Sequence, residues 1–121
     1  MTQSLISYLQ KKPLVAILRG VQSNEIISIA RVLVDSGFSI IEVPLNSPDP
    51  LASITNLSNE FGEKILIGAG TVLQKNDVID IKNAGAKLAV APNANRFASR
   101  IKVTDLLGWY KAQYKICTLD K

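Results

Sequence analysis

One carboxylate interrupts an otherwise apolar stretch and is the residue of this chain best suited to chemistry. Glu42 lies in the run 40–45, whose other members are all apolar. Such a run is typical of a strand buried on both faces of a parallel sheet, and alternation places Glu42 on the face opposite Ile41 and Val43. Burying an ionised carboxylate is unfavourable by several kcal/mol unless the group is paired or its pKa shifts. Glu42 is therefore either held in an ion pair with a basic neighbour or retained as a group that transfers protons.

Further polar residues follow the apolar runs of this chain, which have the length of strands. They are Arg19, Asn46, Thr71 and Asn93. In parallel α/β sheets, functional groups gather at the carboxyl ends of the strands. The pattern therefore predicts a site assembled from several strand–helix loops, although it does not identify the chemistry.

A glycine-rich segment, Gly68-Ala69-Gly70, precedes Thr71 and has two interpretations. It is neither a dinucleotide-binding fingerprint, because Leu73 occupies the last glycine position, nor a phosphate-binding loop with Gly-Lys-Ser/Thr. The glycines either allow close backbone approach inside a narrow barrel or let the backbone contact a ligand. Thr71 in turn either donates a hydrogen bond to a substrate oxygen or caps the next segment.

Four apolar runs alternate with amphipathic segments through residues 1–95. We expect strands at 14–18, 40–45, 64–67 and 88–91, and a helix at 1–10. Further helices follow each of the first three strands, with N-caps at Ser23 and Asp49, Pro50 at the first helical position, and glycine stops at Gly37, Gly62 and Gly85. This succession requires a parallel sheet with right-handed crossovers. Two α/β architectures fit it, a (β/α)₈ barrel and an open doubly wound sheet.

The composition limits the class of protein. With 121 residues the chain makes one domain at most, and its apolar fraction of 47% is that of a globular protein. One cysteine and no histidine exclude a disulfide framework, a zinc cluster and a histidine-based triad. No apolar run reaches 18 residues and no signal peptide is recognisable, so we expect a cytoplasmic protein with no membrane partner.

The composition changes near Asn95, and we treat 1–95 and 96–121 as separate parts. Residues 1–94 hold eight basic and eight acidic residues, whereas 95–121 hold six basic and two acidic residues and four of the seven aromatic ones. A short helix is expected from Thr104 to about Cys117. Basic residues beside aromatic ones also suit single-stranded nucleic acid, but scattered charges are more typical of a solvated face, so we expect no nucleic-acid partner.

Four segments together resemble the amino-terminal half of the KDPG/KHG aldolase family, in this order and spacing: AILRG at 16–20, IEVPLNSP at 41–48, LIGAGTVL at 66–73 and APN at 91–93. The resemblance covers about residues 13–95. It implies a (β/α)₈ barrel, commonly trimeric. It also implies cleavage of a phosphorylated 2-keto-3-deoxy sugar acid to pyruvate and glyceraldehyde 3-phosphate through a lysine Schiff base, without a metal or other cofactor.

The resemblance assigns roles residue by residue. Glu42 matches the general acid/base of the family. Arg19 matches the arginine that is placed to stabilise this carboxylate or the negative charge of the substrate. Thr71 matches the threonine near the pyruvate carboxylate, and Pro92 the proline after the fourth strand. Asn46 departs from the gluconate branch of the family, which has an arginine there, and favours the galactonate branch.

The Schiff-base lysine of the family has no counterpart among the matched segments. In the family it lies on the sixth strand, and we assign it to no residue of this chain. We therefore expect parallel β/α units of a TIM barrel truncated to about four repeats, with a divergent helical tail that a frameshift or early stop would explain. Such a chain is expected to be inactive alone. Because it would have two free sheet edges and an uncovered apolar face, we also expect a homo-oligomer or a poorly soluble protein. The alternative is a non-catalytic half-barrel module for assembly or binding.

Overall fold

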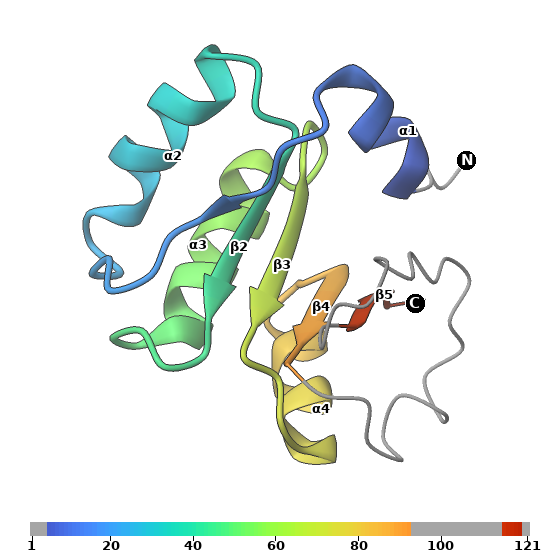
Figure 1. Ribbon diagram of the computed structural model, residues 1–121. Coiled ribbons are helices and arrows are strands. Elements are labelled where there is room, and N and C mark those ends of the chain that lie inside the picture. Colours follow the sequence, from blue (N-terminus) through green and yellow to red (C-terminus); the bar gives the residue numbers. More distant parts are fainter. Residues whose placement is uncertain (1–4, 93–114, 120–121) are drawn as a thin grey trace.

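The computed structural model describes residues 5–92 and 115–119, which form a sheet with helices packed on it (Figure 1). Four parallel strands lie side by side in chain order, followed by one antiparallel strand: β1 (Ala16–Ile17), β2 (Ile40–Pro44), β3 (Leu66–Gly70), β4 (Leu88–Ala91) and β5 (Lys115–Thr118). The helices are α1 (Leu5–Lys11), α2 (Ile26–Asp35), α3 (Pro50–Phe61) and α4 (Lys75–Asn83). The predicted alternation of strands and helices is confirmed.

The main core lies between the sheet and helices α2, α3 and α4. Alternate residues of the two central strands point into it, namely Ile41 and Val43 of β2 and Ile67 and Ala69 of β3. The apolar stripes of the helices meet them with Ile26, Ala30, Ile54, Leu57, Phe61 and Ile81. These are the positions that the helical and strand periodicities select.

The opposite face of the sheet carries a second, smaller cluster. Leu5 of α1 packs there with one residue from each of β2, β3 and β4, which are Ile40, Leu66 and Leu88. These strand residues lie near the amino ends of their strands, so α1 covers that end of the face. Glu42 belongs to the same face, one alternation further toward the carboxyl ends.

Helix boundaries follow their capping residues with one exception. Asp49 is the N-cap of α3 and Pro50 its first residue, as predicted. Gly37 and Gly85 end α2 and α4 with φ of +91° and +101°, a left-handed conformation that glycine adopts without steric penalty. Ser23 was predicted as the N-cap of α2 and this was wrong. Its place is taken by Glu25, because the chain first makes a turn in which the Glu25 N–H donates to the Gln22 carbonyl at 3.0 Å.

Two strands differ in length from the prediction. β1 has two residues instead of five, because it lies at the edge and pairs with β2 alone. β3 continues through Gly70 instead of stopping at Ile67. Its glycines pair in register with Glu42 and Pro44 of β2, so the glycine-rich segment is strand and not loop.

The end of the chain also differs from the prediction. Residues 104–114 lie outside the described residues, and so does the proposed boundary at residue 95. Residues 115–117, placed in a helix by the sequence, belong instead to strand β5, which pairs antiparallel with β4 from Leu88↔Thr118 to Ala91↔Lys115. This pairing supplies partners to backbone groups that a bare β4 edge would leave open. The expectation of two free sheet edges was therefore wrong at β4.

Two kinds of feature are missing from the part of the chain that the structure describes. None of its helices has the length and hydropathy needed to cross a membrane. Within the same residues, no three histidine, cysteine, aspartate or glutamate side chains come together as a potential metal site.

Candidate active site

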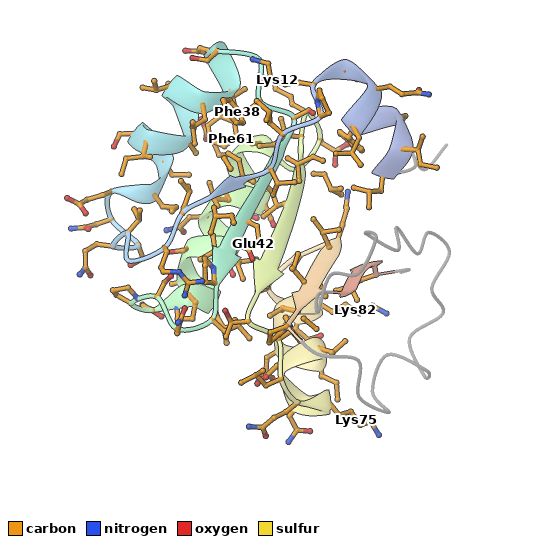
Figure 2. All side chains as sticks on the ribbon, in the orientation of Figure 1. Lys12, Phe38, Glu42, Phe61, Lys75 and Lys82 are labelled. Atoms are coloured by element: carbon orange, nitrogen blue, oxygen red, sulfur yellow. The ribbon has the colours of Figure 1, made fainter. Side chains whose placement is uncertain are left out.

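Glu42 lies in the middle of β2 (Figure 2). The residue is only 5% exposed. On the neighbouring strand β3 the residues of this face that lie level with Glu42 and beyond it toward the carboxyl end are Gly68 and Gly70. A Cβ atom added to Gly70 would collide with the Glu42 carboxylate, and one added to Gly68 would lie 2.7 Å from Cβ of Leu88. Gly70 therefore provides the space that the carboxylate occupies, and Gly68 leaves room for Leu88, which agrees with close packing at the glycines, whereas contact with a ligand stays a prediction.

The surroundings of Glu42 keep its carboxyl group close to half-protonated at neutral pH. Burial raises the pKa of Glu42 from 4.5 to about 7, although the positive charge of Arg19 acts in the opposite direction. Oε2 of Glu42 is buried and accepts no hydrogen bond within the described part of the chain. A carboxyl group in this state can both give and take a proton near pH 7, as general acid/base catalysis requires.

Two loops meet beside Glu42 at the carboxyl ends of β1 and β2. Nη1 of Arg19 donates to Oδ1 of Asn46 at 2.5 Å, and the N–H of Gly20 donates to Oγ of Ser47 at 3.2 Å. The strands beneath them are aligned by the Ile17↔Glu42 register and by the Leu18 N–H, which donates to the Glu42 carbonyl at 2.9 Å. The structure thus brings together three of the predicted site residues, Arg19, Glu42 and Asn46.

Thr71 and Pro92 follow β3 and β4 at the same edge of the sheet, and both are half-buried. Thr71 has φ of +55°, which is a rare conformation for a β-branched residue. The next residue continues the ladder, because the Val72 N–H donates to the Val90 carbonyl at 3.2 Å. Strained backbone of this kind is common at functional sites. Within the described residues, no hydrogen bond joins Thr71 or Pro92 to Glu42, so their roles stay predictions, and Asn93 lies outside the described residues.

Two residues of this region were not singled out from the sequence. Gly70 was noted as part of a glycine-rich segment but not as the neighbour of Glu42, and Ser47 was noted only within the segment IEVPLNSP. No local signal identifies Gly70, because its contact with Glu42 depends on the register of β2 and β3, which pairs Glu42 with Gly68 and Pro44 with Gly70. The Gly20–Ser47 bond joins residues 27 positions apart, so it has no local signature.

The lysines of residues 5–92 do not adjoin Glu42. Lys11, Lys12, Lys64 and Lys87 precede strands and so lie toward the opposite edge of the sheet. Lys75 and Lys82 belong to α4, and Figure 2 shows them well away from Glu42. Within residues 5–92, the site therefore has a proton-transfer group with cationic and amide side chains beside it, but no amine in place to form a Schiff base.

Comparison with known proteins identifies the family. The model of a protein family described as KDPG and KHG aldolase matches residues 5–104 of this chain. The chain belongs to this family. The segments that carry the resemblance in the sequence are those that form β1 to β4 and the loops after them.

Curated relatives of this aldolase-family chain match it over part of their length. It is 43% identical over 83 residues to the 2-dehydro-3-deoxy-6-phosphogalactonate aldolase of Escherichia coli (strain K12), a match that covers 69% of this chain and 40% of that protein. It is 40% identical over 94 residues to the probable 2-dehydro-3-deoxy-6-phosphogalactonate aldolase of Rhizobium meliloti (strain 1021), covering 78% and 44%. The chain thus spans less than half the length of these relatives.

Solved structures of the family share the fold of this chain. A structure described as native KDPGal is 42% identical with a TM-score of 0.68, and covers 70% of this chain and 41% of the other. The KDPG aldolase from Legionella pneumophila, with pyruvate captured as a covalent carbinolamine intermediate, is 25% identical with a TM-score of 0.70, covering 79% and 48%. The aldolase-family chain therefore has parallel β/α units of the barrel type and not those of an open doubly wound sheet.

Proposed function

We propose that this chain supplies the acid/base part of a class I, Schiff-base aldolase. The reaction would cleave 2-dehydro-3-deoxy-6-phosphogalactonate, or its gluconate epimer, to pyruvate and glyceraldehyde 3-phosphate. The observation that carries the proposal is the buried Glu42 in the middle of β2, whose pKa is raised to about 7. Family membership supports the same chemistry.

In this proposal Glu42 moves the protons of the reaction. It would donate a proton when the carbinolamine loses water and take one when the carbon–carbon bond breaks, and a pKa near neutrality suits both steps. Arg19 and Asn46 would bind the negative charge and the polar groups of the substrate, and Thr71 and Pro92 would line the pyruvate end. The amine that forms the Schiff base would come from residues outside those described here, as the position of the lysine in the family implies.

The substrate epimer is proposed from Asn46 and from the relatives. Both curated phosphogalactonate aldolases are at least 40% identical to this chain, whereas the KHG/KDPG aldolase of Escherichia coli (strain K12) is 30% identical over 86 residues. Asn46 stands where the gluconate branch has an arginine, so a neutral amide replaces a charged group beside the substrate. We therefore propose phosphogalactonate as the preferred substrate. We also propose that the protein acts in the cytoplasm.

A homotrimer is the assembly that we propose. A solved protein cage designed by fusing symmetric oligomeric domains contains a region 41% identical to this chain, with a TM-score of 0.65. Light scattering on the purified protein would measure the assembly directly, and a stable monomer would contradict this part of the proposal.

The proposed role of Glu42 is tested in a complete barrel. Residues 5–92 of this chain would replace the matching segment of the Escherichia coli relative, and pyruvate release from phosphogalactonate would be measured. Glu42→Gln should lower kcat by about 100-fold or more, because the amide cannot transfer the proton. Glu63→Gln, at an exposed position, is the matched control. A folded chimera in which Glu42→Gln keeps full activity would overturn the proposal.

A non-catalytic module is the second candidate, and β5 is the observation that favours it. This strand pairs with the edge of β4 at which a further parallel strand of a barrel would lie. Treatment of the unmodified chain with pyruvate and borohydride tests this second candidate. A reduced pyruvate–lysine adduct, located by mass spectrometry, contradicts the module. An acid/base half without its lysine also gives no adduct, so in that case activity of the chimera separates the two functions.

A further inference from the structure

Ser47 is a buried hydroxyl residue for which the proposed reaction has no use. Its side chain is 8% exposed, although it follows the exposed Asn46 in the loop after β2. Its backbone N–H donates to the carbonyl of Pro44, the last residue of β2, at 3.0 Å. The hydroxyl is therefore held in a fixed place relative to the strand that carries Glu42.

The partner of this hydroxyl is the residue next to Arg19. Oγ of Ser47 accepts the N–H of Gly20 at 3.2 Å, and Gly20 has φ of +77°. A Cβ on Gly20 would meet nothing within 4 Å, so the glycine is needed for its left-handed backbone and not for space. That conformation turns the chain after Arg19, and the Ser47 hydroxyl satisfies the N–H of the turn.

The contacts form a closed loop around the arginine. Ser47 holds Gly20, Arg19 precedes Gly20, and the guanidinium of Arg19 donates to Asn46, which precedes Ser47. We propose that Ser47 is a positioning residue, whose hydroxyl anchors the Arg19–Gly20 turn and so fixes the distance between the Arg19 guanidinium and the Glu42 carboxylate. This role of Ser47 rests on the proposed function, in which Glu42 carries the proton. The contacts of Ser47 and Arg19 do not depend on that function.

The consequence of this anchoring is electrostatic. Arg19 is the charged group of the described residues that lowers the pKa of Glu42 against the effect of burial. The adjacent strand β3 presents Leu66, Gly68 and Gly70 to the same face, and β1 presents Ile17, so no titratable group faces Glu42 from these strands. If the turn loosens, the guanidinium spends less time near Glu42 and the pKa of Glu42 must rise further.

The test is an NMR titration of the Glu42 side-chain carboxyl carbon in the protein without substrate. Ser47→Ala should raise the titration midpoint of Glu42 by roughly half a pH unit or more, because a close charge shifts a neighbouring carboxyl by about one unit or more. Ser47→Thr keeps a hydroxyl and should restore the midpoint. If Ser47→Ala does not fold, Ser47→Cys, which fills the same space with a poor acceptor, should give a shift of the same sign.

Ser39→Ala is the matched control. Ser39 is 7% exposed and its hydroxyl also makes one bond, to the Tyr8 carbonyl at 3.0 Å, but at the other end of β2. It should leave the midpoint unchanged. Arg19→Gln should raise the midpoint, and adding Ser47→Ala to it should produce no further change, because Ser47 acts through Arg19.

The outcomes distinguish this inference from the proposed function. An unchanged midpoint in folded Ser47→Ala, or an equal shift in Ser39→Ala, overturns the positioning role. A further shift when Ser47→Ala is added to Arg19→Gln overturns it as well. Because the titration needs no substrate, a shift that depends on Arg19 stands even if the complete barrel shows no cleavage of phosphogalactonate.

Discussion

Glu42 remains buried because the neighbouring strand has no side chains at the positions that face it. The apolar neighbours of Glu42 in the sequence predicted its burial and left open an ion pair or a proton carrier. Within the described residues, no basic group lies in salt-bridge range of this carboxylate, and the only ion pair found there joins Arg31 and Glu60. The role of Gly70 could not be predicted in the same way, because it depends on the register between two strands.

The stability of the protein should fall as Glu42 ionises. The pKa of Glu42 is about 7 in the folded chain and near 4.5 when unfolded, so the folded state binds more protons between these values and the free energy of unfolding decreases as pH rises through 7. The decrease from pH 5 to pH 8 should be on the order of 2 kcal/mol. Urea unfolding of Glu42→Gln should lack this part of the pH dependence, and Glu63→Gln should retain it. An equal slope in wild type and Glu42→Gln would contradict the burial argument.

Gly70→Ala should displace the Glu42 carboxylate. The added methyl group occupies the position of the carboxylate oxygen, so the side chain must move toward water. We expect a loss of roughly 1–3 kcal/mol in the free energy of unfolding and a lower pKa of Glu42. Gly68→Ala is the matched control, because its methyl group would meet Leu88 at 2.7 Å instead. It should destabilise the protein without lowering the pKa, and a lowered pKa in both variants would show that the effect is not local.

At the scale of whole elements, most of the arrangement could be predicted from local patterns. Apolar periodicity and the glycines after α2 and α4 located the helices, because a left-handed glycine commonly ends a helix. Strand ends were predicted less well. β1 is shorter than its apolar run and β3 is longer, because strand length depends on the pairing partners and not on the residues of the strand alone.

The charges at helix ends lead to an element-scale prediction. Nζ of Lys12 donates to the carbonyl of Ser36, at the carboxyl end of α2, over 2.7 Å. The same atom lies 5.1 Å from the ring centre of Phe38. Figure 2 labels both Lys12 and Phe38. Lys75 is instead the first residue of α4, where a positive charge opposes the helix dipole. Lys12→Met should lower the free energy of unfolding by about 0.5–1.5 kcal/mol. Lys75→Met should not lower it, and equal losses would contradict the assignment.

The arrangement of the whole molecule is where the sequence was least informative. Residues 115–117 of β5 were predicted as the end of a helix, because the spacing of apolar residues in a short segment fits a helix as well as a strand. What decides its conformation is the open edge of β4, which is supplied by residues some 27 positions earlier in the chain. The Leu119 N–H extends the contact by donating to the Lys87 carbonyl at 2.9 Å.

Pairing of β4 with β5 can be tested by cross-linking. Ala89 is directly opposite Cys117 in the antiparallel register, and Cys117 is the one cysteine of the chain. Directly opposed residues have Cα atoms about 4.5–5.5 Å apart, within the range of a disulfide. Ala89→Cys should therefore form an intramolecular disulfide on mild oxidation, detected by mass spectrometry of peptides. Val90→Cys, which lies opposite Ile116 and faces the other side of the sheet, should cross-link far less. Equal cross-linking of both variants would mean that the end of the chain does not hold this register, and the observation that favours the non-catalytic module would be lost with it.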